Sequence, residues 1–305
     1  MRIAVTGGTG TIGGGVVTAL RERGEEVVAL SRDTDRARSQ LGAGVEAAAW
    51  VDPAREPAPA DALAGADAVI NLMGAPVEQR WSDRAKRAIR ESRVAGTRNL
   101  VAGIEAAEPR PSVLVSQSAS GWYGARGDEL VGESEPPAED DFLADVTVGW
   151  EREARRAEEH GLRVTTARTG VVLSETGGAL EKMLPFFKLG IGGPVAGGGQ
   201  YVPWIHQDDE VAALLHLLDT DSASGPVNVG APEPATNKEL SKALGRVLRR
   251  PAFAPVPGLA VRVLYGDMAQ IVTTGVRMDT GRLRELGFEW RFPELEPALR
   301  SVTSD

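Results

Sequence analysis

The chain has 305 residues, of which 42% are apolar, and it carries a formal net charge of −9. It has no cysteine and three histidines, so we expect no disulfide framework, no thiol nucleophile and no metal site. The acidic balance argues against a nucleic-acid or membrane partner, and the chain has no run of 18 apolar residues that could form a transmembrane helix. The first predicted strand starts at Arg2, which leaves no room for a signal peptide, so we expect a cytoplasmic protein.

Apolar runs alternate with helical stretches through the first half of the chain. The predicted strands are IAVT (3–6), VVALS (27–31), VEAAAW (45–50), AVINLMG (68–74), SVLVSQS (112–118) and RVTTART (163–169). Helical spacing predicts helices over 12–23, from about 82 to 107, and near 142–160. Strands this apolar, separated by helices, predict an α/β fold with a Rossmann-type, doubly wound parallel sheet.

The pattern loosens after about residue 174, where glycine-rich stretches predict loops and short elements. The run YVPWIH (201–206) predicts a strand, followed by an aspartate cap and a helix. We therefore expect an NADP-binding Rossmann domain over 1–173, to which 201–230 returns. Residues 174–200 and 231–305 are expected to form a smaller C-terminal substrate lobe.

A glycine-rich loop follows the first strand and opens the first helix, with the spacing G-x-G-x-x-G at its centre. Glycine lets the backbone turn tightly, and the helix N-terminus offers N–H groups and a positive dipole end to a pyrophosphate. The motif therefore predicts dinucleotide binding, and the alternative is a glycine-rich turn without a ligand. The predicted contact residues are Gly7, Thr9, Gly10, Thr11, Ile12 and Gly13.

The end of the second strand bears on the choice of nucleotide. Arg32 can pair with the 2′-phosphate of NADP, and Ser31 can donate to it. Asp33 keeps NAD as an alternative, because a carboxylate near this position binds the ribose hydroxyls of NAD. We favour NADP, in the form of NADPH, over NAD. The alternative for Arg32 is an ordinary exposed side chain.

Five motifs follow one another along the chain: TGGTGTIG, NLMG, SQSASGWYG, WIHQDD and GPVNVG. In this order and spacing they resemble the extended short-chain dehydrogenases/reductases of the NAD(P)-dependent epimerase/dehydratase superfamily. Longer stretches resemble its YfcH-like branch of epimerase family proteins, which has a C-terminal domain of unknown function: RWSDRAKRAIRESRVAGTRNL, DDFLADVTVGWE and GFEWRFPELEPAL. The resemblance covers nearly the whole chain.

The resemblance implies a catalytic serine and a Tyr-x-x-x-Lys pair, and this chain departs from both. Phe142 stands where the tyrosine is expected and Val146 where the lysine is expected, and neither can transfer a proton. The usual serine position is Ala119, flanked by Ser118 and Ser120, and a shift of one residue would restore either serine. An enzyme of this kind therefore needs a non-standard acid or base.

Four polar side chains are candidates for that role. Tyr123 lies past the fifth strand, Lys86 and Arg93 share a predicted helix face, and His206 titrates near neutrality. Arg93 also stands where the resemblance implies an asparagine in the motif N-x-x-G-T. The alternatives are a pocket wall for Tyr123, solvated charges for Lys86 and Arg93, and a structural role for His206.

Further cofactor contacts are carried over from the resemblance by position. Asp52 is expected near the adenine. The expected contacts along the cofactor and at its nicotinamide end are Leu72, Met73, Gly74, Arg168, Thr169 and Gly170. The alternative is that each is only a strand-end residue.

Two functions of different class remain. In the first, the chain is an NADP-dependent oxidoreductase or epimerase-like enzyme that acts on a small polar substrate such as a sugar nucleotide. In the second, it is a catalytically degenerate NADP-binding regulator or redox sensor. The long helices also allow two subunits to pair as a homodimer.

Overall fold

A computed structural model describes residues 1–303 of the chain. A seven-stranded sheet, in which every neighbouring pair is parallel, forms its centre in the order β11-β7-β5-β4-β1-β2-β3. The strands are β1 (Arg2–Thr6), β2 (Glu26–Ser31), β3 (Val45–Ala49), β4 (Ala68–Asn71), β5 (Val113–Ala119), β7 (Arg163–Thr169) and β11 (Gly225–Val229). This arrangement confirms the predicted doubly wound α/β fold.

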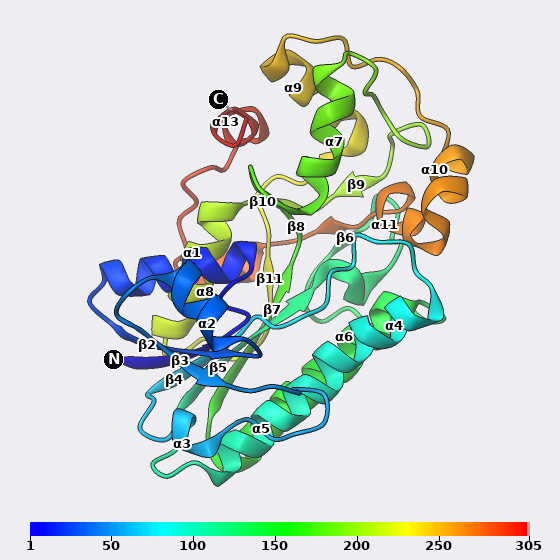
Figure 1. Ribbon diagram of the computed structural model, residues 1–305. Coiled ribbons are helices and arrows are strands. Elements are labelled where there is room, and N and C mark those ends of the chain that lie inside the picture. Colours follow the sequence, from blue (N-terminus) through cyan, green and yellow to red (C-terminus); the bar gives the residue numbers. More distant parts are fainter. Residues whose placement is uncertain (304–305) are drawn as a thin grey trace.

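Helices cover both faces of the sheet (Figure 1). One face carries α1 (Thr11–Glu22), α2 (Thr34–Leu41) and α8 (Gln207–Asp219). The other carries α3 (Ala60–Leu63), α4 (Asp83–Arg90), α5 (Gly96–Ala106) and α6 (Phe142–Arg155). Side chains alternate between the faces, so that Ile3 and Val5 join one buried cluster and Ala4 joins the other. The apolar runs of the sequence are therefore strands buried on both faces.

The long helix expected over about 82–107 forms with one irregularity. Its two α-helical parts, α4 and α5, are joined by a π-helical segment, Glu91–Ala95. Single π-helical turns of this kind occur mostly inside α-helices and often at functional sites. The helix expected near 142–160 also forms, with α6 continuing into a 3₁₀ turn over Arg156–His160.

The second half of the chain contains more regular structure than the sequence predicted. It contains the 11-residue helix α7 (Gly178–Lys188) and the 12-residue helix α9 (Asn237–Leu248), where loops and short elements were expected. The remaining helices are α10 (Gly258–Tyr265), α11 (Gln270–Thr273), α12 (Gly281–Glu285) and α13 (Leu295–Ser301). These helices find their apolar partners across the chain, as where α7, α9 and α13 share one buried cluster.

Three two-stranded pairs lie outside the central sheet: β8 (Val171–Leu173) with β10 (Trp204–His206), β9 (Tyr201–Val202) with β12 (Ala235–Thr236), and β6 (Leu130–Val131) with β13 (Arg277–Met278). The strand expected over 201–206 is thus two strands, because Pro203 interrupts it. The predicted division into two lobes remains a prediction. Part of the predicted smaller lobe packs on the main core, since Leu283 and Phe288 belong to the cluster beneath α1 and α8.

Candidate functional site

The glycine loop between β1 and α1 is built for close approach of the backbone to a ligand. Gly7 has φ +67°, and a Cβ there would lie 2.6 Å from the carbonyl oxygen of Leu72. A Cβ on Gly13 would lie 2.2 Å from the carbonyl oxygen of Gly7. Gly10 caps α1 without a side-chain hydrogen bond, and the first turn has no acidic residue. The helix N-terminus therefore remains open to an anion, and these residues fit a pyrophosphate.

The other predicted loop residues complete this cradle. Thr9, Gly10 and Thr11 are exposed, and Ile12 is half-buried against the core. The hydroxyl of Thr11 donates to the carbonyl of Thr176 at 3.4 Å. The segment that precedes α7 therefore lies beside the open helix N-terminus.

The end of β2 presents a free guanidinium beside that loop. Arg32 is exposed and has no hydrogen-bond or ion-pair partner among residues 1–303. Asp33 is the N-cap of α2, because its Oδ1 accepts the N–H of Arg36 at 2.9 Å. The hydroxyl of Ser31 donates to the carbonyl of Asp33. Arg36 is also exposed, its guanidinium has no partner in the described chain, and it is a second cation that sequence reasoning missed. Its position in the first turn of the helix that follows Arg32 was the available signal.

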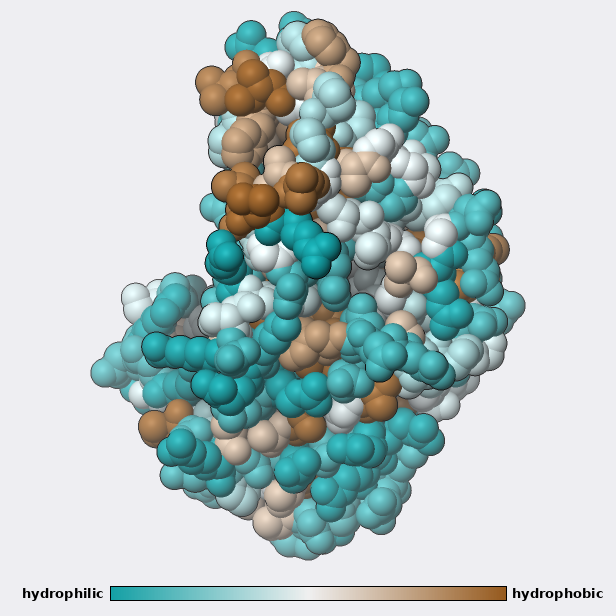
Figure 2. Space-filling view, turned by 90° about the vertical axis from the view of Figure 1, so that its right-hand side faces the viewer, coloured by the Kyte–Doolittle hydropathy of each residue, from teal (hydrophilic) through white to brown (hydrophobic). Residues whose placement is uncertain are grey.

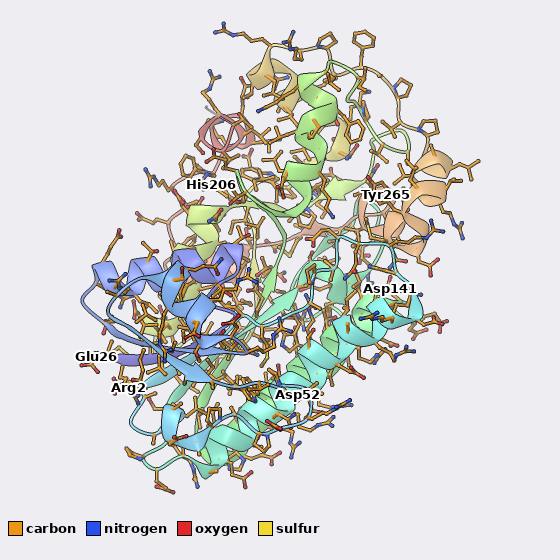
Figure 3. The ribbon with its side chains drawn as sticks, viewed as in Figure 1. Arg2, Glu26, Asp52, Asp141, His206 and Tyr265 are labelled. Carbon is orange, nitrogen blue, oxygen red and sulfur yellow. The ribbon has the colours of Figure 1, made fainter. Side chains whose placement is uncertain are left out.

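Residues after β3 and β4 border the same edge of the sheet. Asp52 is half-buried in the loop after β3 (Figure 3). Its carbonyl accepts two backbone N–H groups. The N–H of Leu72 donates to the hydroxyl of Thr6 at 3.1 Å, which ties the end of β4 to the glycine loop. Met73 is half-buried and packs against the core beneath α5. These three positions lie where the resemblance expects cofactor contacts, and their roles remain predictions.

Arg93 lies on the π-helical segment and reaches back to the loop after β4. Its Nη1 donates to the carbonyl of Ala75 at 2.9 Å, and its guanidinium lies 5.2 Å from the ring centre of Trp150. A Cβ on Gly74 would lie 2.8 Å from this guanidinium, so a larger residue there would require Arg93 to move. Burial lowers the pKa of Arg93 to about 10. The cation is therefore held at the sheet edge and is not a solvated surface charge.

Lys86 does not join Arg93, although both were expected on one helix face. Its Nζ forms an ion pair with Asp267 at 2.7 Å and lies 5.6 Å from the ring centre of Phe142. Arg93 instead reaches back to the carbonyl of Ala75, so the two side chains have different partners. Lys86 thus links α4 to the segment that follows α10.

The two serines beside Ala119 have different surroundings. The hydroxyl of Ser118 is buried and donates to Oε1 of Glu151 at 2.6 Å. Ser120 is half-buried at the edge of a small pocket. Of the two, Ser120 is therefore the one that a ligand could reach.

Tyr123 and Arg168 belong to a closed polar network beneath β5 and β7. Tyr123 is fully buried, and its hydroxyl donates to Oδ1 of Asn228 at 2.6 Å and accepts from Arg168 at 3.1 Å. Arg168 also binds both carboxylate oxygens of Glu151, at 2.8 and 3.0 Å, and stacks on Trp122. Burial raises the pKa of Tyr123. This environment favours packing roles for both residues over proton transfer or cofactor contact.

Thr169 and Gly170 end β7 against neighbouring segments. The hydroxyl of Thr169 donates to Glu210 at 2.8 Å on the face covered by α8. A Cβ on Gly170 would lie 2.0 Å from the carbonyl oxygen of Pro203, so glycine allows the chain before β10 to pass. Both positions are occupied by contacts within the protein.

His206 is itself the cap of α8, which corrects the expected aspartate cap. Its Nδ1 accepts the N–H of Asp208 at 3.0 Å, its Nε2 contacts the hydroxyl of Ser301, and its ring stacks on Phe292. Burial lowers the pKa of His206. Figure 3 shows it far from Asp141, near the C-terminal part of the chain. It therefore lies in the packing between α8 and α13.

A pocket of about 100 Å³ opens between the end of β5, the start of α6, β9 and α11. Its polar lining residues are Ser120, Asp141, Tyr201, Gln270 and Thr274. Asp141 points two oxygens in different directions: Oδ1 caps α6, and Oδ2 accepts from Nε2 of Gln270 at 3.2 Å. Ser120 is the predicted catalytic side chain that lines this pocket. Asp141 was missed, although an aspartate directly before a helical run signals a cap.

The comparisons with known proteins place this geometry in a family. Residues 3–230 match the NAD dependent epimerase/dehydratase family, and residues 256–302 match a domain of unknown function, DUF1731. The chain therefore belongs to the NAD-dependent epimerase/dehydratase family, as predicted.

Individual relatives match over nearly the whole chain. The epimerase family protein SDR39U1 homolog of Arabidopsis thaliana chloroplasts is 38% identical over 99% of this chain and 86% of its own. YfhF of Bacillus subtilis is 32% identical over 100% of this chain and 99% of its own. The crystal structure of human SDR39U1 with NADPH superposes with a TM-score of 0.88, at 32% identity over 99% of each chain.

Proposed function

We propose that this protein is an NADP(H)-dependent enzyme of oxidoreductase or epimerase type that acts on a small polar substrate. The observation that carries the proposal is the free guanidinium of Arg32 beside an open glycine cradle, while Asp33 is committed to capping α2. A guanidinium suits a 2′-phosphate, and a committed carboxylate cannot bind ribose hydroxyls as well. The NADPH in the crystal structure of human SDR39U1 supports the same cofactor.

The described residues divide the work of binding. The amides from Thr11 to Gly13 hold the pyrophosphate, since the amide of Gly10 donates to the carbonyl of Gly7, and Arg32 and Arg36 hold the 2′-phosphate. The bound cofactor would supply or accept a hydride. Arg93 keeps a positive charge behind the loop that follows β4 and holds that loop through the carbonyl of Ala75.

The pocket beside β5 is the proposed substrate site. Ser120 and Gln270 offer hydrogen bonds to a polar substrate, which suits the hydroxyl groups of a sugar. Asp141 Oδ2 is the pocket oxygen proposed to accept a proton from a substrate hydroxyl, because Oδ1 is held by the N-cap hydrogen bonds. Phe142, at the place of the usual tyrosine, packs on Trp81 at 5.2 Å instead.

The cofactor proposal is tested by calorimetric titration of the protein with NADPH and with NADH. We expect Arg32→Ala to weaken NADPH binding at least tenfold and to leave NADH binding nearly unchanged, because only NADPH carries the 2′-phosphate. The matched control is Arg84→Ala, which removes an exposed arginine of α4. Equal losses for both nucleotides would show that Arg32 does not read the phosphate.

A second function is favoured by one specific observation. Ser118 and Tyr123 are buried in a closed network, and Phe142 and Val146 are apolar, so a regulator or redox sensor that binds NADPH without turnover is the alternative. Hydride transfer from NADPH to a panel of carbonyl compounds separates the two. Tight NADPH binding, no turnover with any compound and a bound protein partner would favour the regulator.

A further inference from the structure

The C-terminal lobe exposes most of the large apolar side chains on the surface. Of the ten that are exposed in the described chain, seven lie between residues 186 and 264. Three of them belong to the end of α7 and the loop after it, and three belong to α10. Phe253, which is 81% exposed, lies in the chain between α9 and α10. A concentration of this kind marks an interaction surface.

These segments are neighbours in the fold and form one face. The backbones over 194–196 and 256 exchange two hydrogen bonds of 2.9 Å, which bring the loop after α7 beside the chain that leads into α10. Figure 2 shows the apolar side chains gathered on the upper part of the molecule, above a mainly hydrophilic half. We call this surface the apolar face.

A cationic groove of about 500 Å³ adjoins the apolar face and shares Phe253 with it. Its charged lining residues are Lys238, Lys242, Arg246, Arg249 and Arg250, and no carboxylate lines it. Arg246 pairs with Glu296 at 2.8 Å. The side chains of Lys238, Arg249 and Arg250 have no hydrogen-bond or ion-pair partner among residues 1–303.

The groove opposes the charge of the whole chain, which is −9. Arg249 even adopts φ +53° at the end of α9, a conformation that favours glycine at helix ends. Arg249 therefore lies in a backbone conformation that is strained for a residue other than glycine. The groove is therefore locally positive, although the chain as a whole is negative.

We propose that the apolar face and the cationic groove together dock the protein on a membrane surface that contains anionic lipids. The protruding apolar side chains enter the boundary between headgroups and acyl chains, and the free cations attract lipid phosphates. Contact is peripheral, because no helix within residues 1–303 has the length and apolar character needed to cross a bilayer. The acidic remainder of the molecule is repelled by the same lipids, so the charges select this orientation.

Two other occupants fit the surface less well. A two-fold pairing with a second copy would bring each surface against its own equivalent and so set the groove cations close to one another. A protein partner would need pockets to receive its anchors, since Leu189 and Phe253 protrude with exposed fractions of 74% and 81%. A bilayer accepts protruding side chains without a matching shape.

The test is co-sedimentation of the full chain with vesicles of phosphatidylcholine alone and with vesicles that contain 30% phosphatidylglycerol. We expect binding to the anionic vesicles at least tenfold stronger than to the neutral ones, and we expect it to weaken as salt rises from 0.1 to 0.5 M. Equal binding to both, or binding to neither, would overturn the proposal. Retention by polyglutamate but not by vesicles would assign the face to an acidic protein and would also overturn it.

Two double variants separate the face from the overall charge. The first variant, Lys238→Glu with Arg250→Glu, reverses two groove cations. The second, Leu189→Ser with Phe253→Ser, removes two exposed apolar side chains. We expect each double variant to weaken binding to anionic vesicles at least tenfold. The matched control is Arg84→Glu with Arg87→Glu, which makes the same change of charge on exposed positions of α4. An equal loss in the control would mean that net charge alone governs binding, and the face would have no special role. Thermal melting of each variant verifies that it folds.

Discussion

Glu210 carries a carboxyl group that the fold buries completely beneath β5 and β7. Its Oε1 accepts from Thr169 and from Gln117, while its Oε2 has no hydrogen-bond partner in the described chain. Burial raises the pKa of Glu210 to about 8 from an ordinary value of 4.5. The side chain is therefore protonated at neutral pH in the folded protein.

This shift predicts a pH dependence of stability. The folded-state pKa is raised, so the contribution of Glu210 to stability is complete below about pH 4.5 and is lost as the pH rises to about 8. We expect Glu210→Gln to remove that loss, so that urea unfolding at pH 5, 7 and 8.5 shows a smaller decline in the free energy of unfolding than in the wild type. Glu159→Gln, at an exposed carboxyl, should decline as the wild type does. Equal declines in all three proteins would contradict the prediction.

At the scale of elements, Asp141 at the start of α6 has a structural role as the helix cap and a proposed role as a catalytic base. Asp141 caps the helix through Oδ1 and presents Oδ2 to the substrate pocket. The two tasks can be separated by substitution, because asparagine caps helices about as well as aspartate but cannot accept a proton from a hydroxyl. The helix end therefore offers a direct test of the proposed base.

We expect Asp141→Asn to retain the melting temperature and NADPH binding and to reduce turnover at least a hundredfold. Asp141→Ala should lose turnover and also about 1 kcal/mol of stability with the cap. Calorimetry and hydride-transfer assays measure the two effects. If Asp141→Asn turned over substrate like the wild type, the proton would have to be moved by another group.

At the scale of the whole molecule, the C-terminal segment completes the core beside the sheet. Leu283 and Phe288 are buried in the same cluster as β1 and α8, and both carboxylate oxygens of Asp209 accept backbone N–H groups from Arg291 and Phe292. The strand β13 also pairs with β6. The matched region 256–302 is thus continuous with the Rossmann core.

From this continuity we expect one cooperative thermal transition by scanning calorimetry, with a calorimetric enthalpy close to the van't Hoff enthalpy. The buried contacts between residues 277–292 and the sheet body couple the unfolding of the two parts. Two resolved transitions, with the smaller one lost on removal of residues 256–305, would show instead that the C-terminal region unfolds by itself.

The polar side chains show how far sequence reasoning reaches. Arg32 and the glycine loop could be proposed as cofactor contacts from the sequence, because strand order and backbone freedom indicate such a site, and their roles remain predictions. Tyr123 and His206 have the chemistry of catalytic groups, but their hydroxyl and ring nitrogens are used to join distant elements. No local pattern distinguishes a reactive tyrosine from a buried one.

The sequence by itself predicted six of the seven strands of the sheet, three of the helices, the glycine loop and the family, because apolar periodicity and glycine spacing act over short stretches of chain. Only the tertiary structure decided which polar groups reach the pocket, since Asp141 meets Gln270 across 129 positions. It also decided that an acidic chain carries a cationic groove. Burial and charge separation depend on residues that are far apart along the chain, and folding alone brings them together.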